Sequence, residues 1–302
     1  MPELPDVQVY VERIRAFTLG KPLVALSIRS PFVVRTVVPA IGSLVGLPVV
    51  DVRRINKRIA IGFEGDRWMV IHLMVAGRLR WKPKAPAANA PNVLAIWTFD
   101  GGNLVLTEAS SKKRASIHVV EGEAALEQFD RGGLEPIDSS LADFREVLLR
   151  ERHTVKRTLT DPHLFSGIGN AYSDEILHKA QLSPARWTTL LDEEQIHRLW
   201  RATQEVLTWW TEHLRAEIGD GFPDQVTAFR PEMAAHGKFK QPCPVCGTPI
   251  QRIQYADNET NYCPTCQTEG KLLADRALSQ LLKGDWPKTL DELEERKARS
   301  KA

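Results

Sequence analysis

The sequence has no long hydrophobic run and no excess of one charge. No stretch approaches the roughly 18 to 20 apolar residues of a membrane-spanning helix, so contact with a membrane is not expected. Lysine and arginine number 40 against 38 aspartates and glutamates, giving a net charge of +2. Charge on this scale does not indicate a nucleic-acid partner, and any basic binding surface must be local.

Cysteine is also scarce. The chain has four cysteines, all between Cys243 and Cys266, whereas a secreted disulfide protein usually spreads its cysteines across its cores. The opening "MPELPDVQVY" has neither the basic segment nor the apolar run of a secretion leader. These features predict a cytoplasmic protein with a metal site.

The first part of the chain combines one helix with many strands. The 302 residues allow two ordinary domains and a small appendage. Apolar residues recur at helical spacing from Val7 to Phe17, and Gly20 follows as a stop. Within about 22–122, "VLAIWTF" and "NLVLTEA" flank the turn "DGG", and "RIAIGF" and "WMVIHLMV" flank "EGDR". We predict antiparallel hairpins, with a surface loop over 82–91.

A helical pattern follows over roughly 142–218. Asp192 is an N-cap candidate because Gln195 lies three residues later. The residues that then share one helical face are Ile196, Leu199, Thr203, Val206, Leu207 and Trp210. We assign the tryptophans of this helix to the core. The segment 218–240 is predicted to be a mobile connection.

The predicted fold class is α+β with several domains. An N-terminal helix and antiparallel β-sandwich or barrel precede a helical domain and a zinc ribbon. The predicted boundaries are a first domain over 1–125, a linker over 126–141, a helical domain over 142–237, a zinc ribbon over 238–269 and an extension over 270–302. In the extension we expect a docked helix over 272–282 and a frayed, charged tail.

The segment "CPVCGTPIQRIQYADNETNYCPTC" carries the strongest chemical signal. Two C-x-x-C pairs are separated by sixteen residues, enough for a β-hairpin. Four thiolates can close a tetrahedral shell around one Zn²⁺ and leave no position for water, so the zinc should be structural. The predicted ligands are Cys243, Cys246, Cys263 and Cys266. Two disulfides are the alternative.

The run "GIGN", Gly167 to Asn170, lies between two helical patterns and opens the second. Glycines let the backbone approach a partner closely, and a helix N-terminus offers N–H groups to an anion. Beside a zinc ribbon, this turn predicts phosphate binding. A purely structural glycine turn is the alternative.

Taken in order, these motifs resemble the formamidopyrimidine-DNA glycosylase and endonuclease VIII family. The likeness runs from residue 2 to about residue 267. It includes the "MPELP" start, "NKR" around Lys57, "VIHLMVAGRLRW", "LEP", "VKRTLTD", "GIGN" and "HGKFKQPCPVCGTPI".

The resemblance implies a DNA glycosylase and AP lyase that acts on damaged DNA, double- or single-stranded. Once Met1 is removed, the amine of Pro2 would attack C1′ of the deoxyribose, displace the damaged base and leave an iminium. β-Elimination would then cleave the strand, and in the family a second elimination often follows. Glu3 would protonate the sugar ring oxygen, and Lys57 would approach the phosphate and sugar.

The resemblance also implies a set of DNA contacts. Asn170, together with the amides of Gly167 and Gly169, would hold a backbone phosphate. Lys156, in the "VKRTLTD" segment, joins this set. We expect a monomer.

The sequence departs from the family pattern at three places. Val75 stands where the family has a void-filling methionine. The family's Arg-Phe-Gly loop is missing, and the corresponding stretch contributes Lys112, Lys113 and Arg114. Asn258 stands where the family has a zinc-ribbon arginine that clamps phosphates.

These departures leave the substrate open. Cations in place of an apolar wedge favour backbone contact over stacking, so single-stranded, abasic or crosslinked DNA is one alternative substrate. A DNA-binding protein of the same architecture without efficient base excision is another alternative. Lys238, Lys240 and Arg252 are candidates to replace the missing arginine.

Overall fold

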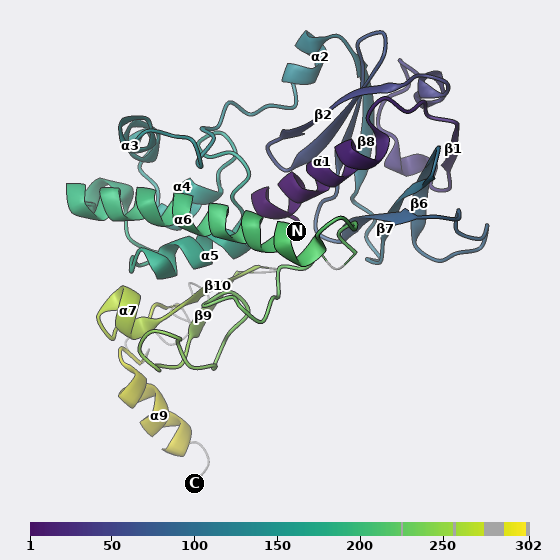
Figure 1. Ribbon diagram of the computed structural model, residues 1–302. Coiled ribbons are helices and arrows are strands. Elements are labelled where there is room, and N and C mark those ends of the chain that lie inside the picture. The colour runs from purple at the N-terminus through teal and green to yellow at the C-terminus, as the bar shows by residue number, and fades with distance from the viewer. Residues whose placement is uncertain (225, 256–257, 275–286, 300–302) are drawn as a thin grey trace. The chain divides into compact units, whose positions relative to one another are not determined.

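The computed structural model forms two compact units (Figure 1). Unit 1 comprises Met1–Gly133 and Thr208–Thr227, and unit 2 comprises Leu134–Leu207 and Ala228–Ala302. The structure describes residues 1–224, 226–255, 258–274 and 287–299, without the side chains of Tyr255, Asn258, Glu294 and Lys297.

Unit 1 begins with helix α1 (Leu4–Thr18), as the sequence predicts. Strands then follow in chain order: β1 (Ala25–Ile28), β2 (Val49–Ile55), β3 (Arg58–Phe63), β4 (Arg67–His72), β5 (Gly77–Lys82), β6 (Val93–Phe99), β7 (Gly102–Glu108) and β8 (Ser116–Glu121). Two 3-10 turns, η1 (Pro31–Val33) and η2 (Ile41–Leu44), lie between β1 and β2, and a short helix α2 (Glu123–Glu127) follows β8.

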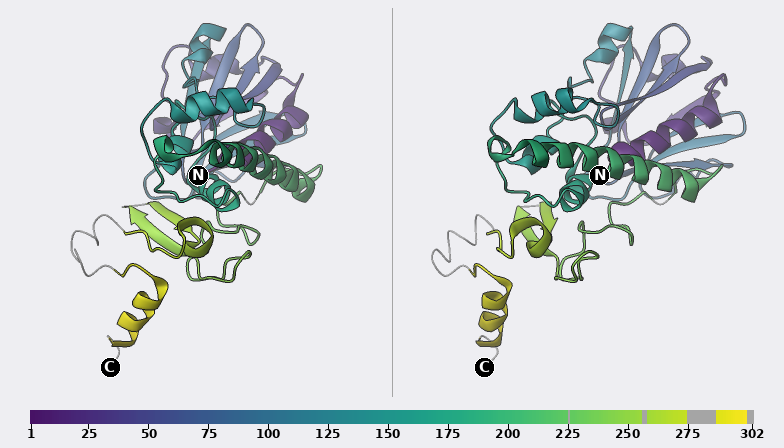
Figure 2. Two further views of the ribbon diagram at one scale, coloured as in Figure 1. Left: turned by 90° about the vertical axis from the view of Figure 1, so that its left-hand side faces the viewer. Right: turned by 60° about the vertical axis from the view of Figure 1, so that its left-hand side comes forward.

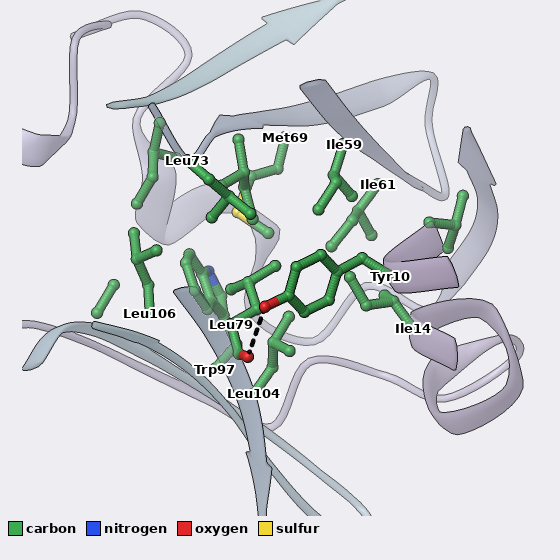
Figure 3. Close-up of a cluster of buried hydrophobic side chains, with 14 of the residues drawn as sticks. Tyr10, Ile14, Ile59, Ile61, Met69, Leu73, Leu79, Trp97, Leu104 and Leu106 are labelled. Atoms are coloured by element: carbon green, nitrogen blue, oxygen red, sulfur yellow. Dashed lines mark hydrogen bonds between the residues drawn. The ribbon is translucent and has the colours of Figure 1, made fainter. Parts of the chain in front are cut away.

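The strands form two antiparallel sheets, ordered β1-β6-β7-β5 and β2-β3-β4-β8. Alternate residues of β3, such as Ile59 and Ile61, point into a core that also receives residues of the other sheet. Figure 3 shows Tyr10 of α1 in this core, where its hydroxyl donates to the Leu79 carbonyl oxygen at 3.2 Å. The shared core confirms the predicted sandwich.

Two details of unit 1 correct the sequence-based predictions. The predicted strand "WMVIHLMV" ends at His72, because Met74 has a φ of 53° and the Gly77 amide donates to the Leu73 carbonyl at 2.9 Å in a tight turn. The predicted mobile connection is instead packed: the Phe222 ring lies 5.8 Å from that of Tyr10, and Val226 is buried. Its apolar residues are too widely spaced to show a period.

Unit 2 is helical at first. It contains α3 (Leu141–Leu149), α4 (Val155–Thr160), α5 (Asn170–Lys179), the 3-10 turn η3 (Thr188–Leu190) and the first part of α6 (Glu193–Ile218), which continues into unit 1. Asp192 caps α6 as predicted, because its Oδ1 accepts the Gln195 amide at 2.8 Å. The assignment of all tryptophans of α6 to the core is wrong, since Trp209 is 49% exposed.

The last part of unit 2 is the ribbon. Strands β9 (Gln251–Tyr255) and β10 (Asn258–Tyr262) form the predicted hairpin, and α7 (Pro264–Thr268) follows it (Figure 2). Most of the expected docked helix over 272–282 lies outside the described residues, which end at 274 here and resume at 287. The expected frayed tail is wrong, because Leu290–Arg299 form helix α9. Among the described residues, none of the helices combines the length and apolar character required to cross a bilayer.

Candidate active site and nucleic-acid interface

The start of α1 explains the "PELPD" sequence. Glu3 is the N-cap, its carboxylate accepts the Asp6 amide, and its own amide donates to Asp6 Oδ2 at 3.0 Å. This reciprocal capping box satisfies two amides at the helix start. Pro2, Glu3 and Asp6 are all buried. The capping box therefore fixes the backbone directly after Pro2.

Two cations and two carboxylates surround the amino terminus, which Met1 carries in this structure. Burial lowers the pKa of the terminal ammonium; Arg78 and Lys57 lower it further, whereas Glu3 and Asp6 oppose the shift. Burial also lowers the pKa of Lys57, against the attraction of Glu3. Both shifts favour the neutral form of the amino terminus and of the Lys57 amine, and Glu3 interacts with both groups.

Lys57 reaches this site from a turn and Arg78 from the start of a strand. Lys57 lies in the β2–β3 turn, next to Asn56, which has a left-handed φ of 57°. Arg78 lies at the start of β5, where its Nε donates to the Val226 carbonyl at 2.6 Å. The sequence analysis does not include Arg78 among the site residues, because no spacing pattern distinguishes it from the other arginine of "AGRLRW".

His72 at the end of β4 is directly opposite Arg58. Burial, together with Arg58, Lys57 and His118, lowers its pKa from 6.5 to about 4. The folded state therefore disfavours the protonated ring, and stability should fall as the pH drops from about 6.5 to about 4. We expect His72→Gln to remove on the order of 2 kcal/mol of that loss, after allowance for partial exposure. Urea unfolding at several pH values tests this, and parallel pH profiles for the two proteins would contradict it.

The cationic loop after β7 is exposed. Lys112, Lys113 and Arg114 all lie at its surface. The buried carboxylate of Glu108 fixes the loop by accepting the Arg114 amide at 3.0 Å and the Ala115 amide at 3.1 Å. Val75, in the turn before β5, is 59% exposed. Exposed cations on a fixed loop can contact a phosphate backbone.

In unit 2, the glycine turn leads directly into α5. Gly167 has a left-handed φ of 78°, and Gly169 is the N-cap of α5, whose first residue is Asn170. The Asn170 side chain donates to the Glu259 carbonyl of β10 at 2.7 Å. The turn is therefore held against the ribbon.

A buried hydrogen-bond network also holds helix α5 in place. Asp174 accepts hydrogen bonds from Lys156 Nζ at 2.6 Å and from the Asn261 amide at 3.2 Å, and its Oδ2 lies 2.8 Å from His236 Nδ1. The Glu175 carboxylate accepts three successive amides, of residues 234 to 236. Lys156 thus lies within this internal network and also donates to the Asn170 carbonyl at 3.1 Å.

The four cysteines come together at the base of the hairpin. Their sulfur atoms lie within 4.8 Å of one another, with 3.9 Å between Cys243 and Cys266 and 3.4 Å between Cys246 and Cys263. A tetrahedral zinc thiolate site has sulfurs roughly 3.8 Å apart, given Zn–S bonds of about 2.3 Å. Four soft donors at this spacing fit one structural zinc ion.

Three segments of the chain match models of known protein families. Residues 1–113 match the formamidopyrimidine-DNA glycosylase N-terminal domain, residues 133–215 match its H2TH domain, and residues 240–268 match a zinc finger found in FPG and IleRS. The chain belongs to the formamidopyrimidine-DNA glycosylase family. This is a family of DNA glycosylases with AP lyase activity.

Relatives align over half of the chain or more. The formamidopyrimidine-DNA glycosylase of Thermus thermophilus is 32% identical over 277 residues, covering 89% of this chain and 100% of that protein. An uncharacterized formamidopyrimidine-DNA glycosylase-like protein of Mycobacterium tuberculosis is 39% identical over 151 residues, covering 50% of this chain and 94% of that protein.

Solved structures agree in fold. The MutM (Fpg) protein of Thermus thermophilus has a TM-score of 0.73 at 29% identity, covering 88% of this chain and 98% of that one. A Lactococcus lactis Fpg variant in complex with a Fapy-dG-containing DNA has a TM-score of 0.76 at 25% identity, covering 88% and 100%.

The structure shows which cation lies near position 258, where the sequence departs from the pattern of this glycosylase family. The side chain of Asn258 lies outside the described residues. Arg252, on the neighbouring strand, has its guanidinium 4.3 Å from the Phe239 ring centroid and 3.2 Å from Glu259 Oε2. Glu259 connects Arg252 to the glycine turn, because its carboxylate contacts Arg252 and its backbone carbonyl accepts the Asn170 side chain.

Proposed function

We propose that this chain excises damaged bases from DNA and cleaves the resulting abasic strand through the amine of Pro2. The nitrogen lone pair would bond to C1′ while the base departs with its electron pair and is protonated. Opening of the sugar ring gives an iminium, which acidifies the adjacent C2′ and allows β-elimination of the 3′ phosphate. The observation that carries the proposal is the buried Pro2, joined to a capped helix start beside Glu3, Lys57 and Arg78.

The neighbouring side chains divide the remaining work. Glu3 is proposed to protonate the sugar ring oxygen and to shuttle protons, since it is the carboxyl adjacent to the nucleophile. Lys57 is proposed to contact the lesion phosphate. A neutral amine is required at Pro2, and the burial that lowers the pKa of the Met1 ammonium one residue earlier supports this.

DNA binding is proposed for the surface of unit 2 and for the cationic loop of unit 1. Asn170, with the backbone amides near Gly167 and Gly169, would hold one phosphate. Lys156 would act by holding this turn through Asp174. We retain the division into domains over 1–125, 142–237 and 238–269, and infer a cytoplasmic, nucleoid-associated location from the substrate.

An incision assay tests the proposal. Protein with a verified mature N-terminus would be incubated with damaged-base duplex, abasic duplex and abasic single-stranded DNA. Cleavage of damaged-base duplex is expected for a glycosylase and lyase. Cleavage of abasic substrates alone would restrict the activity to the lyase step, which the cations at Lys112–Arg114 favour. Binding without cleavage of any substrate would contradict the proposal and leave a DNA-binding protein.

Arg252 is proposed to replace the arginine that is absent at position 258. Arg252→Ala should weaken binding to abasic-analogue DNA by about 10-fold and lower the salt dependence by about one phosphate contact. Lys240→Ala tests the rival candidate beside the same ring, because Lys240 Nζ lies 5.3 Å from the Phe239 ring centroid, and it should leave affinity and salt dependence unchanged. Adding Asn258→Arg to Arg252→Ala should restore affinity. Wild-type affinity and salt slope in Arg252→Ala would refute this role.

A further inference from the structure

One side chain outside the four-cysteine cluster contacts a predicted zinc ligand. His178 Nε2 lies 3.2 Å from Cys243 Sγ. Both residues are buried, with exposed fractions of 5% for His178 and 3% for Cys243. His178 belongs to α5, the helix that begins at the glycine turn, and lies 65 positions from Cys243 in the sequence. The contact therefore joins the DNA-binding helix to the metal centre.

The chemistry of this pair has one consistent assignment. A zinc-bound cysteine is a thiolate and can only accept a hydrogen bond, so the Nε2–H tautomer of a neutral imidazole must be the donor. Such a donor disperses negative charge from sulfur and fixes the orientation of the ligand. Hydrogen bonds to metal ligands of this kind are commonly worth 10- to 100-fold in metal affinity.

A second hydrogen-bonded connection lies near the contact between His178 and Cys243. Gln267 of α7 donates through Nε2 to the Leu182 carbonyl at 2.9 Å, and its Oε1 accepts the Cys263 amide at 2.8 Å. At the other end of α5, Asn170 donates to the Glu259 carbonyl at 2.7 Å. Both ends of the helix are thus fixed to the ribbon, one at the metal ligands and one at the hairpin.

We propose that His178 is a positioning residue of the metal centre: it donates a hydrogen bond to the zinc-bound Cys243 thiolate and couples zinc retention to the glycine turn at the start of α5. Zinc occupancy then controls how firmly the phosphate-binding turn is held. The coupling to DNA rests on the proposed function, whereas the effect on zinc does not.

Zinc release from the full-length, zinc-loaded protein tests the first part. His178→Phe keeps a planar ring but removes the donor, and His178→Gln keeps an N–H. His197→Phe, an exposed histidine of α6, is the control. Transfer of zinc to a colorimetric chelator should be 10- to 100-fold faster in His178→Phe, intermediate in His178→Gln and unchanged in His197→Phe. Release at the wild-type rate in His178→Phe would overturn the proposal.

A spectroscopic measurement separates this role from a general loss of folding. In Co²⁺-substituted protein, the sulfur-to-cobalt charge-transfer band should shift in His178→Phe and stay in place in His197→Phe. An unshifted band would overturn the hydrogen bond to the thiolate.

The coupling is tested with abasic-analogue DNA. His178→Phe should bind about 10-fold more weakly when zinc is limiting and recover when zinc is saturating. A loss that persists at saturating zinc, with normal zinc release, would overturn the coupling. If the wild-type protein binds no DNA, the proposed function fails, and the chelator experiment still decides the metal role of His178.

Discussion

Protein that retains a residue in front of Pro2 is expected to cleave abasic DNA at least about 100-fold more slowly than the mature form. With Met1 or a short extension attached, the Pro2 nitrogen belongs to an amide and has no lone pair available for attack on C1′. A factor of 100 corresponds to about 2.7 kcal/mol of transition-state stabilisation. Gel-based cleavage rates, with the N-terminus checked by mass spectrometry, measure this difference.

The comparison of the extended and mature forms is specific to the Pro2 nitrogen, because residues 2–302 are identical in both forms. DNA affinity should agree within about 2-fold between the two forms, since the glycine turn and ribbon are intact in both. Burial lowers the pKa of the amino terminus that Met1 carries in the structure, and if the Pro2 amine of the mature form is buried in the same way, cleavage should stay active below pH 8, because only the neutral amine reacts. Equal cleavage rates for extended and mature protein would rule out Pro2 as the nucleophile.

The second large effect is expected on removal of zinc. The apolar cluster around the metal ligands contains Ile250 besides the cysteines, and Ile253 and Tyr262 of the hairpin are also buried, so the ribbon buries few apolar side chains among its described residues. Metal coordination must supply most of the folding free energy, and structural zinc sites contribute on the order of 10 kcal/mol. The Cys243→Ser/Cys263→Ser double variant should therefore lose the β9–β10 hairpin and bind DNA at least about 100-fold more weakly.

Circular dichroism and DNA titration check this prediction. Chelation of the wild-type protein should reproduce the double variant, and added Zn²⁺ should restore the chelated wild type alone. Trp97, which is buried in the sandwich core, serves as the internal control, because the near-ultraviolet circular dichroism of that core should persist. A chelated protein that keeps full DNA affinity would contradict a structural role for zinc.

Local patterns made much of the fold predictable. The α1 helix, the hairpins of the sandwich, the Asp192 cap and the zinc ribbon each depend on residues close together in the sequence. Spacing rules for helices, strands and metal ligands apply directly to such segments. The family resemblance then ordered these pieces correctly.

The contacts that position the candidate site were not predictable in the same way. Asp174 and His236 are 62 positions apart, and although His236 opens the segment "HGKFKQPCPVCGTPI", nothing in the sequence pairs it with Asp174. The carboxylate of Glu175 and the amides of residues 234 to 236 meet only after the chain has folded. The sequence pattern of the segment 218–240 is therefore that of a loop. In the structure, however, Phe222 packs against Tyr10, and Val226 and His236 are buried.

Borohydride trapping tests the central claim most directly. Mature protein would be mixed with single- and double-stranded abasic DNA in sodium borohydride, beside the N-terminally extended form, Pro2→Gly and Glu3→Gln. Reduction of an iminium yields a stable protein–DNA adduct. The account predicts an adduct with the mature protein, none with the extended form and strongly reduced yield with Pro2→Gly. No adduct from mature protein on either DNA, despite tight binding, would contradict it.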